Sequence, residues 1–524
     1  MNFQNGTEWL WGRKSSVILL FMSAIAMLFM CLGAREIWTQ EHRWADIVFT
    51  MLYNHDYLHP YLNGNTYYDK PLLSYWLISL FSFITGSLST WALRLPSALA
   101  GLLSIWSIYH LGIYLKNRKL GLLAAWMLLT TFYFIFWART SSADMLNMAG
   151  TLFAVTWYFK TKFRTLFSDY VIFFLILAAT ALCKGLLGPV VTVLAILPDL
   201  LAKGEWKKHL RFSMLFAIIP AGIFYVAPFF ASTYFGGEHY QQNGLYQVYR
   251  ENLLRYFQPF DHMGPIYTYF IFLPVYLLPW TFFFIPALFS LKSRWKKMSP
   301  NARWTVWAVV ILFVFLTLSG SRRNYYILPV VPFAILMTAD WILALVTNFK
   351  KEVKPATSNV QHITHVRTQK FAAAFIYSFF IIFFLNFGVA QPFYYARGGT
   401  TEFATALKST ATQVRPWSDW NVVMLDPESK VRFYLGLHPD TKNYGINGSE
   451  RNLQTASTIL KTWPMLSKPD KHTIYISRQS YEPYLKTILK DFDVVEAHPG
   501  LGGKLLNVKN ANLPVAFLPK KDSV

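Results

Sequence analysis

The side chains best suited to chemistry in this sequence are ionisable groups that flank or interrupt long apolar stretches. In chain order they are Arg35 to Asp46, Asp69 with Lys70, Arg139 with Asp144, Lys184, the segment with Glu251, Arg255, Asp261 and His262, and Arg322 to Tyr326. Carboxylates suit general-base or metal-binding work, whereas arginine and lysine suit a phosphate-bearing ligand. If these groups meet in one cavity, that cavity binds an anionic substrate.

The elements that position these groups are predicted to be membrane-spanning helices. Of the 524 residues, 54% are hydrophobic and only 15% are charged, which exceeds what a soluble core needs. Several stretches without a charged side chain have the length that crosses a bilayer as helix. Examples are residues 16–34, 121–137, 212–230 and 304–318. We therefore expect an all-α polytopic membrane part.

Charge placement orients this part. About eleven spans are predicted, near residues 16–34, 92–115, 120–137, 145–159, 170–183, 186–202, 212–230, 266–290, 304–318, 325–347 and 371–390. The net charge of +22 comes largely from alternate short loops, at residues 116–119, 160–164, 203–211, 292–297 and 350–354. Basic loops of this kind mark the cytoplasmic side and contact anionic lipid. Nucleic acid is therefore not an expected partner.

Two further parts complete the predicted organisation. Residues 44–53 and 72–85 read as helices lying at the outer surface, because the second stretch is short for a span. From about residue 397 onward, β-like runs at 422–425 and 472–477 alternate with helical runs at 428–437 and 481–492. We expect a membrane domain over residues 1–395 and a small soluble α/β domain over residues 396–524, outside the membrane.

The ionisable groups named first then lie on the outer side, although the charge rule sends basic residues inward. Arg322 and Arg323 oppose that rule most clearly, and charged groups at membrane level are functional candidates by default. Structural explanations remain open for the others. Glu41 with Arg43 fits an interfacial ion pair, Asp69 or Asp144 a helix cap, and Lys184 a snorkelling lysine. Asp261 with His262 fits an ordinary loop pair.

The order of these motifs resembles a known family. Trp38-x-x-Glu41-x-Arg43-Trp44-Ala45-Asp46 is followed by Asp69-Lys70-Pro71, by Asp144 before the fourth span, by Lys184-Gly185, and by a basic-Tyr motif opening the tenth span. Over about the first 345 residues this order is similar to the polyprenyl-phosphate-sugar-dependent glycosyltransferases of GT-C type. These include bacterial protein O-mannosyltransferases and the 4-amino-4-deoxy-L-arabinose lipid A transferase, to which the resemblance is closer.

The resemblance implies an inverting sugar transfer on the periplasmic face of a bacterial inner membrane. A polyprenyl-phosphate-linked sugar is the donor, drawn from membrane lipid, and a lipid A-like glycolipid or a protein is the acceptor. Alternatives from other classes are a lipid or solute transporter or flippase, and a family member that has lost catalysis. A transporter predicts polar groups near the bilayer midplane and two related halves, neither of which the sequence contains.

The resemblance also assigns roles to residues. Gln40, Glu41 and Arg43 fall on the catalytic loop, and Lys70, Lys184, Arg322, Arg323 and Tyr326 on the donor-phosphate site. Arg139, Asp144 and Arg255 are further cavity residues. Asp69 and His262 are implied as ligands of a possible divalent metal, and no other cofactor is expected.

One position departs from the family pattern. The family's first acid, usually an aspartate assigned as base, is Gln40 here. Either Glu41 acts as base towards a hydroxyl, or the acceptor is a phosphate that is already ionised and needs no strong base. The same substitution also suits a degenerate enzyme.

Overall fold

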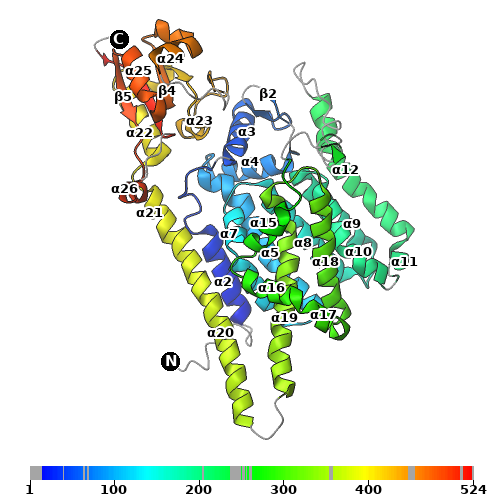
Figure 1. Ribbon diagram of the computed structural model, residues 1–524. Coiled ribbons are helices and arrows are strands. Elements are labelled where there is room, and N and C mark those ends of the chain that lie inside the picture. The colour runs from blue at the N-terminus through cyan, green and yellow to red at the C-terminus, as the bar shows by residue number, and fades with distance from the viewer. Residues whose placement is uncertain are drawn as a thin grey trace.

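The computed structural model describes residues 15–38, 40–62, 65–67, 70–202, 204, 206–235, 250, 254, 257–258, 263–352, 358–446, 455–507 and 512–521. The N-terminal part is mainly helical (Figure 1). Its helices are α2 Ser15–Phe29, α3 Glu41–Asn54, α4 Leu73–Thr85, α5 Thr90–Leu115, α6 Arg118–Leu129, α7 Phe132–Ala138, α8 Ala143–Thr161, α9 Phe167–Lys184, α10 Leu187–Ala202, α11 Trp206–His209, α12 Phe212–Tyr234, α15 Thr268–Tyr276, α16 Thr281–Phe289, α17 Leu291–Arg294, α18 Pro300–Leu318, η3 Asn324–Val330, α19 Val331–Glu352, α20 Ser358–Leu385 and α21 Gln391–Tyr395. A short hairpin, β1 Tyr61–Leu62 with β2 Asn65–Thr66, follows α3.

Small polar residues between the apolar runs begin several of these helices. Ser89, Asn117 and Ser299 each accept a hydrogen bond from a backbone amide in the first turn, at α5, α6 and α18. Such caps satisfy amides that have no partner within the helix. Helix starts are therefore set locally.

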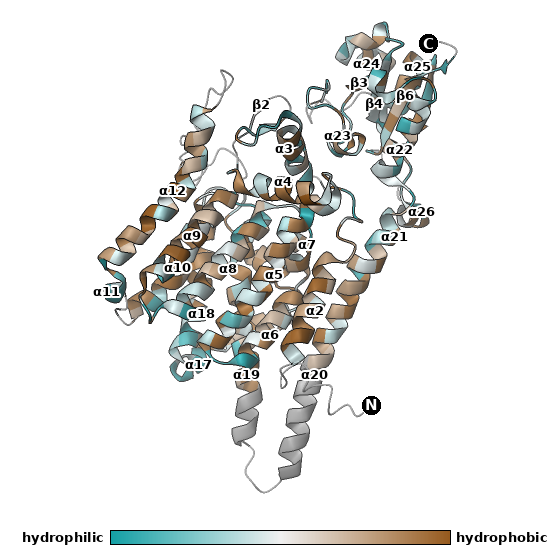
Figure 2. Cartoon of the chain, turned by 180° about the vertical axis from the view of Figure 1, so that it is seen from behind, coloured by the Kyte–Doolittle hydropathy of each residue, from teal (hydrophilic) through white to brown (hydrophobic). Residues whose placement is uncertain are grey.

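Six described helices are long and apolar enough to cross a membrane, or seven if a bent pair is counted as one span. They are Thr90–Leu115, Phe167–Lys184, Phe212–Tyr234, Pro300–Leu318, Asn324–Leu345 and Ala373–Thr412, and the bent pair is α6 with α7, whose axes differ by 71°. Helices α2, α4 and α10 are apolar but shorter. Figure 2 shows the resulting band of hydrophobic helices across the middle of the molecule. The chain has the make-up of a multi-pass membrane protein.

Helices occupy all of the predicted span positions, with two notable differences. The stretch 266–290 is split into the nine-residue helices α15 and α16, separated at residues 277–280. The stretch 120–137 is broken at Thr130 and Thr131, where the Thr131 amide bonds the Leu128 carbonyl and both hydroxyls bond carbonyls four residues back. Neither break follows from hydrophobicity, because both lie within apolar sequence.

The two ends of the bundle differ in composition. Helices α11 and α17, with their lysines, lie at one end, while α3, α4 and the C-terminal sheet lie at the other (Figures 1 and 2). The basic loops at residues 116–119 and 160–164 join the first end, because Asn301 bonds the Leu115 carbonyl at 2.7 Å and Lys162 pairs with Asp199 at 2.7 Å. The clustering of basic loops at one end fits the charge pattern. We call the opposite end the α3 end.

The C-terminal part contains a mixed four-stranded sheet in the order β3-β4-β6-β5. Its strands are β3 Asn421–Met424, β4 Thr473–Arg478, β5 Phe492–Glu496 and β6 Pro514–Pro519, and its longer helices are α22 Gly399–Thr412, α23 Lys430–Leu435, α24 Ala456–Thr462, α25 Glu482–Ile488 and α26 Leu501–Leu505. Strands β3 and β4 are parallel, whereas β6 is antiparallel to both β4 and β5.

Both faces of this sheet are covered. Ile474 and Ile476 pack with α22 in one cluster, and Tyr475 packs with α25 in another. Every residue of β6 is buried, so this strand shows no alternation; neither β6 nor β5 was predicted, whereas β3, β4, α23 and α25 fall close to the predicted runs. That residues 396–524 form an independent soluble domain stays a prediction.

Candidate active site

Glu41 begins α3 at the α3 end and is fully buried. Arg94, from the first turns of α5, bonds both of its oxygens at 2.8 Å. The backbone amides of Trp38 and Ser141 also donate to this carboxylate, each at 2.9 Å, and Arg35 lies 3.5 Å from it. Glu41 is therefore the centre of a network that joins α3, α5 and the start of α8.

This network determines what Glu41 can do. Burial alone raises the pKa of its carboxyl, but Arg94, Arg35 and the Trp38 amide outweigh burial and lower the pKa to about 2. A carboxylate with so low a pKa, whose two oxygens already accept several hydrogen bonds, is a poor general base. The geometry gives Glu41 an organising role.

Gln40 precedes Glu41 but contacts Tyr325 rather than the Glu41 network. Its side chain hydrogen-bonds Tyr325, whose hydroxyl also accepts a 2.6 Å bond from Arg323. Arg323 lies over the Tyr325 ring as well, 5.7 Å from its centroid. The start of η3 thus meets the start of α3.

Asp144, Lys184 and Tyr326 form a neighbouring group. Lys184 is ion-paired with Asp144 and lies 4.6 Å from the centroid of the Tyr326 ring. The rings of Tyr325 and Tyr326 are 5.1 Å apart, so the two groups are continuous. We name the six residues Gln40, Asp144, Lys184, Arg323, Tyr325 and Tyr326 the outer cluster.

Helix geometry explains how distant residues reach this cluster. Asp144 lies in the first turn of α8 and Lys184 ends α9, and these helices are antiparallel neighbours joined by a short loop at the other end. Ser142 caps α8 and donates a 2.9 Å bond to Asp144, which fixes that carboxylate. Gly185, at φ 103°, stops α9 immediately after Lys184, in a conformation that favours glycine.

Two predicted site residues, Arg139 and Arg322, have structural partners in the fold. Arg139 donates to the carbonyls of Met27, Leu28 and Met30 and so caps α2. Arg322 donates to the carbonyls of Thr317 and Gly264, at 3.0 and 2.6 Å. Both arginines satisfy helix-end or loop carbonyls, which gives each of them a structural role.

Of the remaining predicted residues, Arg43 has a different partner and three lie outside the described chain. Arg43 is exposed and bonds the Tyr67 hydroxyl at 2.8 Å rather than Glu41. Lys70 is partly buried. Asp69, Arg255 and His262 lie outside the described residues, so the metal site stays a prediction. No group of three or more His, Cys, Asp or Glu suited to a metal occurs within the described ranges.

Arg94 and the C-terminal part help to build the site, and neither contribution was predicted from the sequence. Arg94 is fully buried, and all its N–H groups have acceptors, because it also bonds the carbonyls of Leu32, Arg35 and Glu36. A lone arginine in an apolar span was the available signal. The C-terminal part was the second contribution, and nothing local marks it.

That part holds the loop preceding Glu41. Lys430 pairs with Glu36 at 2.7 Å, and the Tyr434 hydroxyl accepts a 3.0 Å bond from the Ile37 amide. The backbone amide of Thr400 also donates to Glu36. Residues almost four hundred positions apart thus shape the loop.

The outer cluster can bind an anion. It presents two cationic side chains, Lys184 and Arg323, and two tyrosine rings, with only Asp144 as a counter-charge. Arginine and lysine held by neighbours in this way suit a phosphate group, whereas no proton acceptor other than the paired Asp144 belongs to the cluster.

Residues 69–231 match the protein family described as dolichyl-phosphate-mannose-protein mannosyltransferase. The undecaprenyl phosphate-alpha-4-amino-4-deoxy-L-arabinose arabinosyl transferase of Pectobacterium atrosepticum is 27% identical over 341 residues, which cover 63% of this chain and 59% of that protein. The protein of the same name from Shewanella sediminis is 25% identical over 349 residues, covering 63% and 60%. The match therefore spans about three fifths of these relatives.

Solved structures show the same fold over a larger share of the chain. ArnT from Cupriavidus metallidurans, bound to undecaprenyl phosphate, matches with a TM-score of 0.69 at 15% identity, covering 96% of this chain and 98% of that one. The archaeal oligosaccharyltransferase AglB from Archaeoglobus fulgidus matches with a TM-score of 0.56 at 12% identity, covering 94% and 73%. Together with the motif order, these similarities support the predicted resemblance: the chain shares its fold with these two solved structures and is similar in sequence to polyprenyl-phosphate-sugar-dependent membrane glycosyltransferases.

Proposed function

We propose that this protein transfers a sugar from a polyprenyl-phosphate carrier to a lipid A-like glycolipid at the outer face of a bacterial inner membrane. The observation that carries the proposal is the outer cluster at the α3 end, in which Lys184 contacts Tyr326, Arg323 contacts Tyr325, and the two tyrosine rings contact each other. Two curated relatives are named as transferases of a sugar from undecaprenyl phosphate, which supports the donor class.

The charge balance favours a phosphate as acceptor group. A phosphate oxygen of the acceptor attacks the anomeric carbon, and the bond from that carbon to the carrier phosphate breaks with inversion. The acceptor loses one negative charge and the carrier phosphate gains one, so no proton has to be removed. This explains how Gln40 replaces the family acid without loss of chemistry, and why the poor basicity of Glu41 is tolerated.

The residues of the site then have distinct roles. Lys184 and Arg323 stabilise the charge that develops on the departing carrier phosphate, with Tyr326 beneath Lys184. Asp144 holds Lys184 in position, and Gln40 holds Tyr325. Glu41 and Arg94 fix the loop that carries Gln40. Lys70 and Arg255 remain proposed donor-phosphate and cavity residues, and Asp69 with His262 a proposed divalent-metal pair.

The finer topology belongs to the same proposal. We propose about eleven spans, a membrane domain over residues 1–395 and an outer domain over residues 396–524, with the α3 end in the periplasm, opposite the basic loops. Helices α3 and α4 then lie at the outer interface.

The test is sugar transfer in membranes containing the full chain, with a radiolabelled polyprenyl-phosphate aminoarabinose as donor and lipid A as acceptor. Lys184→Ala is expected to lower kcat about a hundredfold, as losing one oriented charge donor commonly does. The matched control is Lys461→Ala, an exposed lysine on α24, which is expected to behave as wild type. Equal activity of Lys184→Ala and wild type contradicts the assigned site.

A second experiment tests whether the acceptor group is a phosphate. Lipid A whose phosphates have been removed is expected to accept no sugar, because a hydroxyl acceptor needs a base that the described part of the site does not supply. Transfer to dephosphorylated lipid A, or to a protein with lipid A untouched, rules out the phosphate-acceptor mechanism. Movement of the lipid or solute across the membrane without chemical conversion rules out the transferase.

A further inference from the structure

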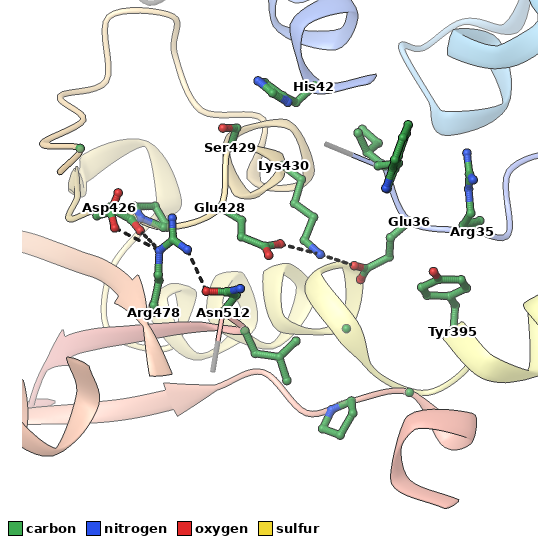
Figure 3. A pocket seen from close by; sticks show the side chains of 18 of the residues that line it. Arg35, Glu36, His42, Tyr395, Asp426, Glu428, Ser429, Lys430, Arg478 and Asn512 are labelled. Atoms are coloured by element: carbon green, nitrogen blue, oxygen red, sulfur yellow. Dashed lines mark hydrogen bonds and ion pairs between the residues drawn. The ribbon is translucent and has the colours of Figure 1, made fainter. Parts of the chain in front are cut away.

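A cavity lies between the loop preceding Glu41 and the C-terminal sheet. Its volume is about 750 Å³, and polar side chains dominate its wall. Figure 3 shows Asp426, Arg478 and Asn512 on one side, the Glu428, Lys430 and Glu36 chain crossing it, and Arg35 with Tyr395 at the other end. None of the outer-cluster residues lines it.

The position of this cavity in the sheet is typical of a binding site. Strands β3 and β4 are parallel, and Asp426 and Arg478 lie at their carboxyl ends. Ligands of sheets with parallel strands usually bind in the crevice outside such ends. Asp426 has a left-handed backbone, at φ 52°, which is uncommon for a residue other than glycine and concentrates at functional sites.

The charges in the cavity wall are balanced and paired. Three basic residues, Arg35, Lys430 and Arg478, face three acidic ones, Glu36, Asp426 and Glu428. Lys430 bridges Glu36 and Glu428 at 2.7 and 2.8 Å, and Arg478 lies 3.1 Å from Asp426. A wall of this kind attracts no free phosphate strongly. It offers donors and acceptors in fixed directions, which suit an uncharged ligand with several hydroxyl groups.

Aromatic rings complete the wall. Trp38 is 40% exposed although its ring edges also contact Phe136 and Trp137, and Tyr395 lies beside Arg35. Exposed rings next to paired polar groups present a flat apolar surface to the C–H face of a sugar while the polar groups take its hydroxyls.

The cavity is adjacent to the outer cluster. Trp38 contacts Trp137 at 6.2 Å between centroids, and Trp137 contacts Tyr325 at 4.9 Å. Arg35 lines the cavity and also reaches Glu41 and, at 2.9 Å, the Thr140 hydroxyl. One layer of side chains therefore separates the two places.

We propose that this cavity binds a sugar ring of the glycolipid acceptor, beside the reacting phosphate, by its hydroxyl groups. The inference rests on the proposed function for the identity of the ligand. It makes the C-terminal part a specificity element, because Asp426, Lys430, Arg478 and Asn512 belong to that part.

The test fills the cavity without breaking its network. Ser429 and Asn443 line it with exposed side chains, and within the described chain neither side chain has a hydrogen bond. Ser429→Trp and Asn443→Trp are compared with Ser409→Trp, at an exposed serine of α22 that lines none of the described cavities. Thermal midpoints establish that all three full-length variants are folded.

Two measurements are made. Calorimetry follows binding of the water-soluble disaccharide obtained by deacylating lipid A, with and without its phosphates. Kinetics follow KM for lipid A and for the polyprenyl donor. The two cavity variants are expected to bind both disaccharides about tenfold more weakly, because the added indole prevents the ligand from making one or two of its hydrogen bonds. They are also expected to raise KM for lipid A, while KM for the donor stays constant.

The outcomes separate this inference from the proposed function. Wild-type affinity and KM in both cavity variants overturn the inference, as does binding confined to the phosphorylated disaccharide. Sugar transfer by a wild-type protein that binds neither disaccharide also overturns it while supporting the transferase. Binding of both disaccharides, lost in the cavity variants, without any sugar transfer supports the cavity and overturns the proposed function.

Discussion

At the scale of single residues, the main determinant is how each charge is partnered. Glu41 and Arg94 are both buried and satisfy one another through two bonds, while Lys184 is held by Asp144. A buried pair contributes less through its own attraction than through the penalty that follows when one partner is lost. Replacing a charged residue therefore has an effect that depends on whether its partner is left buried without a counter-charge.

Removing Glu41 is expected to destabilise the fold rather than only the chemistry. Glu41→Ala leaves Arg94 buried without its counter-ion, at a cost of about 3–5 kcal/mol, and Glu41→Leu with Arg94→Leu is expected to cost less than Glu41→Ala alone. Thermal unfolding of the purified protein measures both. A double variant less stable than Glu41→Ala disproves the pairing argument.

The lowered pKa of Glu41 also predicts an acid dependence. Its folded-state pKa of about 2 lies below the ordinary value of 4.5, so the ionised pair stabilises the fold above pH 4.5 and this stabilisation is lost as the pH falls towards 2. Wild type is expected to lose stability over this window more steeply than Glu41→Gln. Parallel pH profiles of the two proteins contradict the shift.

Replacing Arg322 is expected to affect mainly stability, whereas replacing Arg323 is expected to affect mainly sugar transfer. Arg322→Ala removes two bonds to carbonyls and is expected to lower stability by about 1.5–3 kcal/mol. Arg323→Ala, which leaves those bonds intact, is expected to lower kcat/KM for the donor about tenfold or more with a smaller change in stability. Thermal unfolding and sugar transfer are measured on both variants. A larger loss of stability in Arg323→Ala together with a larger loss of transfer in Arg322→Ala contradicts the assignment.

At the scale of elements, close helix packing positions the site. Gly150 on α8 and Gly188 on α10 both face Thr180 of α9, and neither leaves room for a side chain. Small residues of this kind let membrane helices approach closely. The approach of α8 to α9 also sets the distance between Asp144 and Lys184.

This packing can be tested by adding bulk. Gly150→Val is expected to destabilise the protein by about 1–3 kcal/mol, and to lower transfer by displacing Asp144 from Lys184. Gly222 on α12 is the matched control, because an added side chain there meets nothing within 4 Å. If Gly150→Val and Gly222→Val unfold alike, the close approach of α8 and α9 does not limit the structure.

At the scale of the whole molecule, the C-terminal part and the membrane part share one loop. Lys430→Ala breaks a partly buried ion pair with Glu36 and is expected to cost about 1.5–3 kcal/mol and to speed amide exchange in residues 35–38. Lys486→Ala, which breaks an exposed pair in the same part, is the control and is expected to change little. Hydrogen exchange with mass spectrometry measures both, and equal exchange in the two variants contradicts the link.

The sequence alone determined most helix positions, the segregation of basic loops and the resemblance to a family. These depend on local quantities, namely apolar length, capping residues and short motifs, which survive in a single sequence. The outer-cluster residues Asp144, Lys184, Arg323 and Tyr326 were also predicted together, since their motifs open or close helices on the same side.

Only the tertiary structure decided which charges are free to act. Arg94 and Glu41 are 53 residues apart and Glu36 and Lys430 are 394 apart, and no local pattern pairs them. Arg139 and Arg322 also bond carbonyls that no local pattern predicts, and their place in the site stays a prediction. The reason is physical: a guanidinium or carboxylate acquires its role from the partners that folding brings to it, and those partners come from distant parts of the chain.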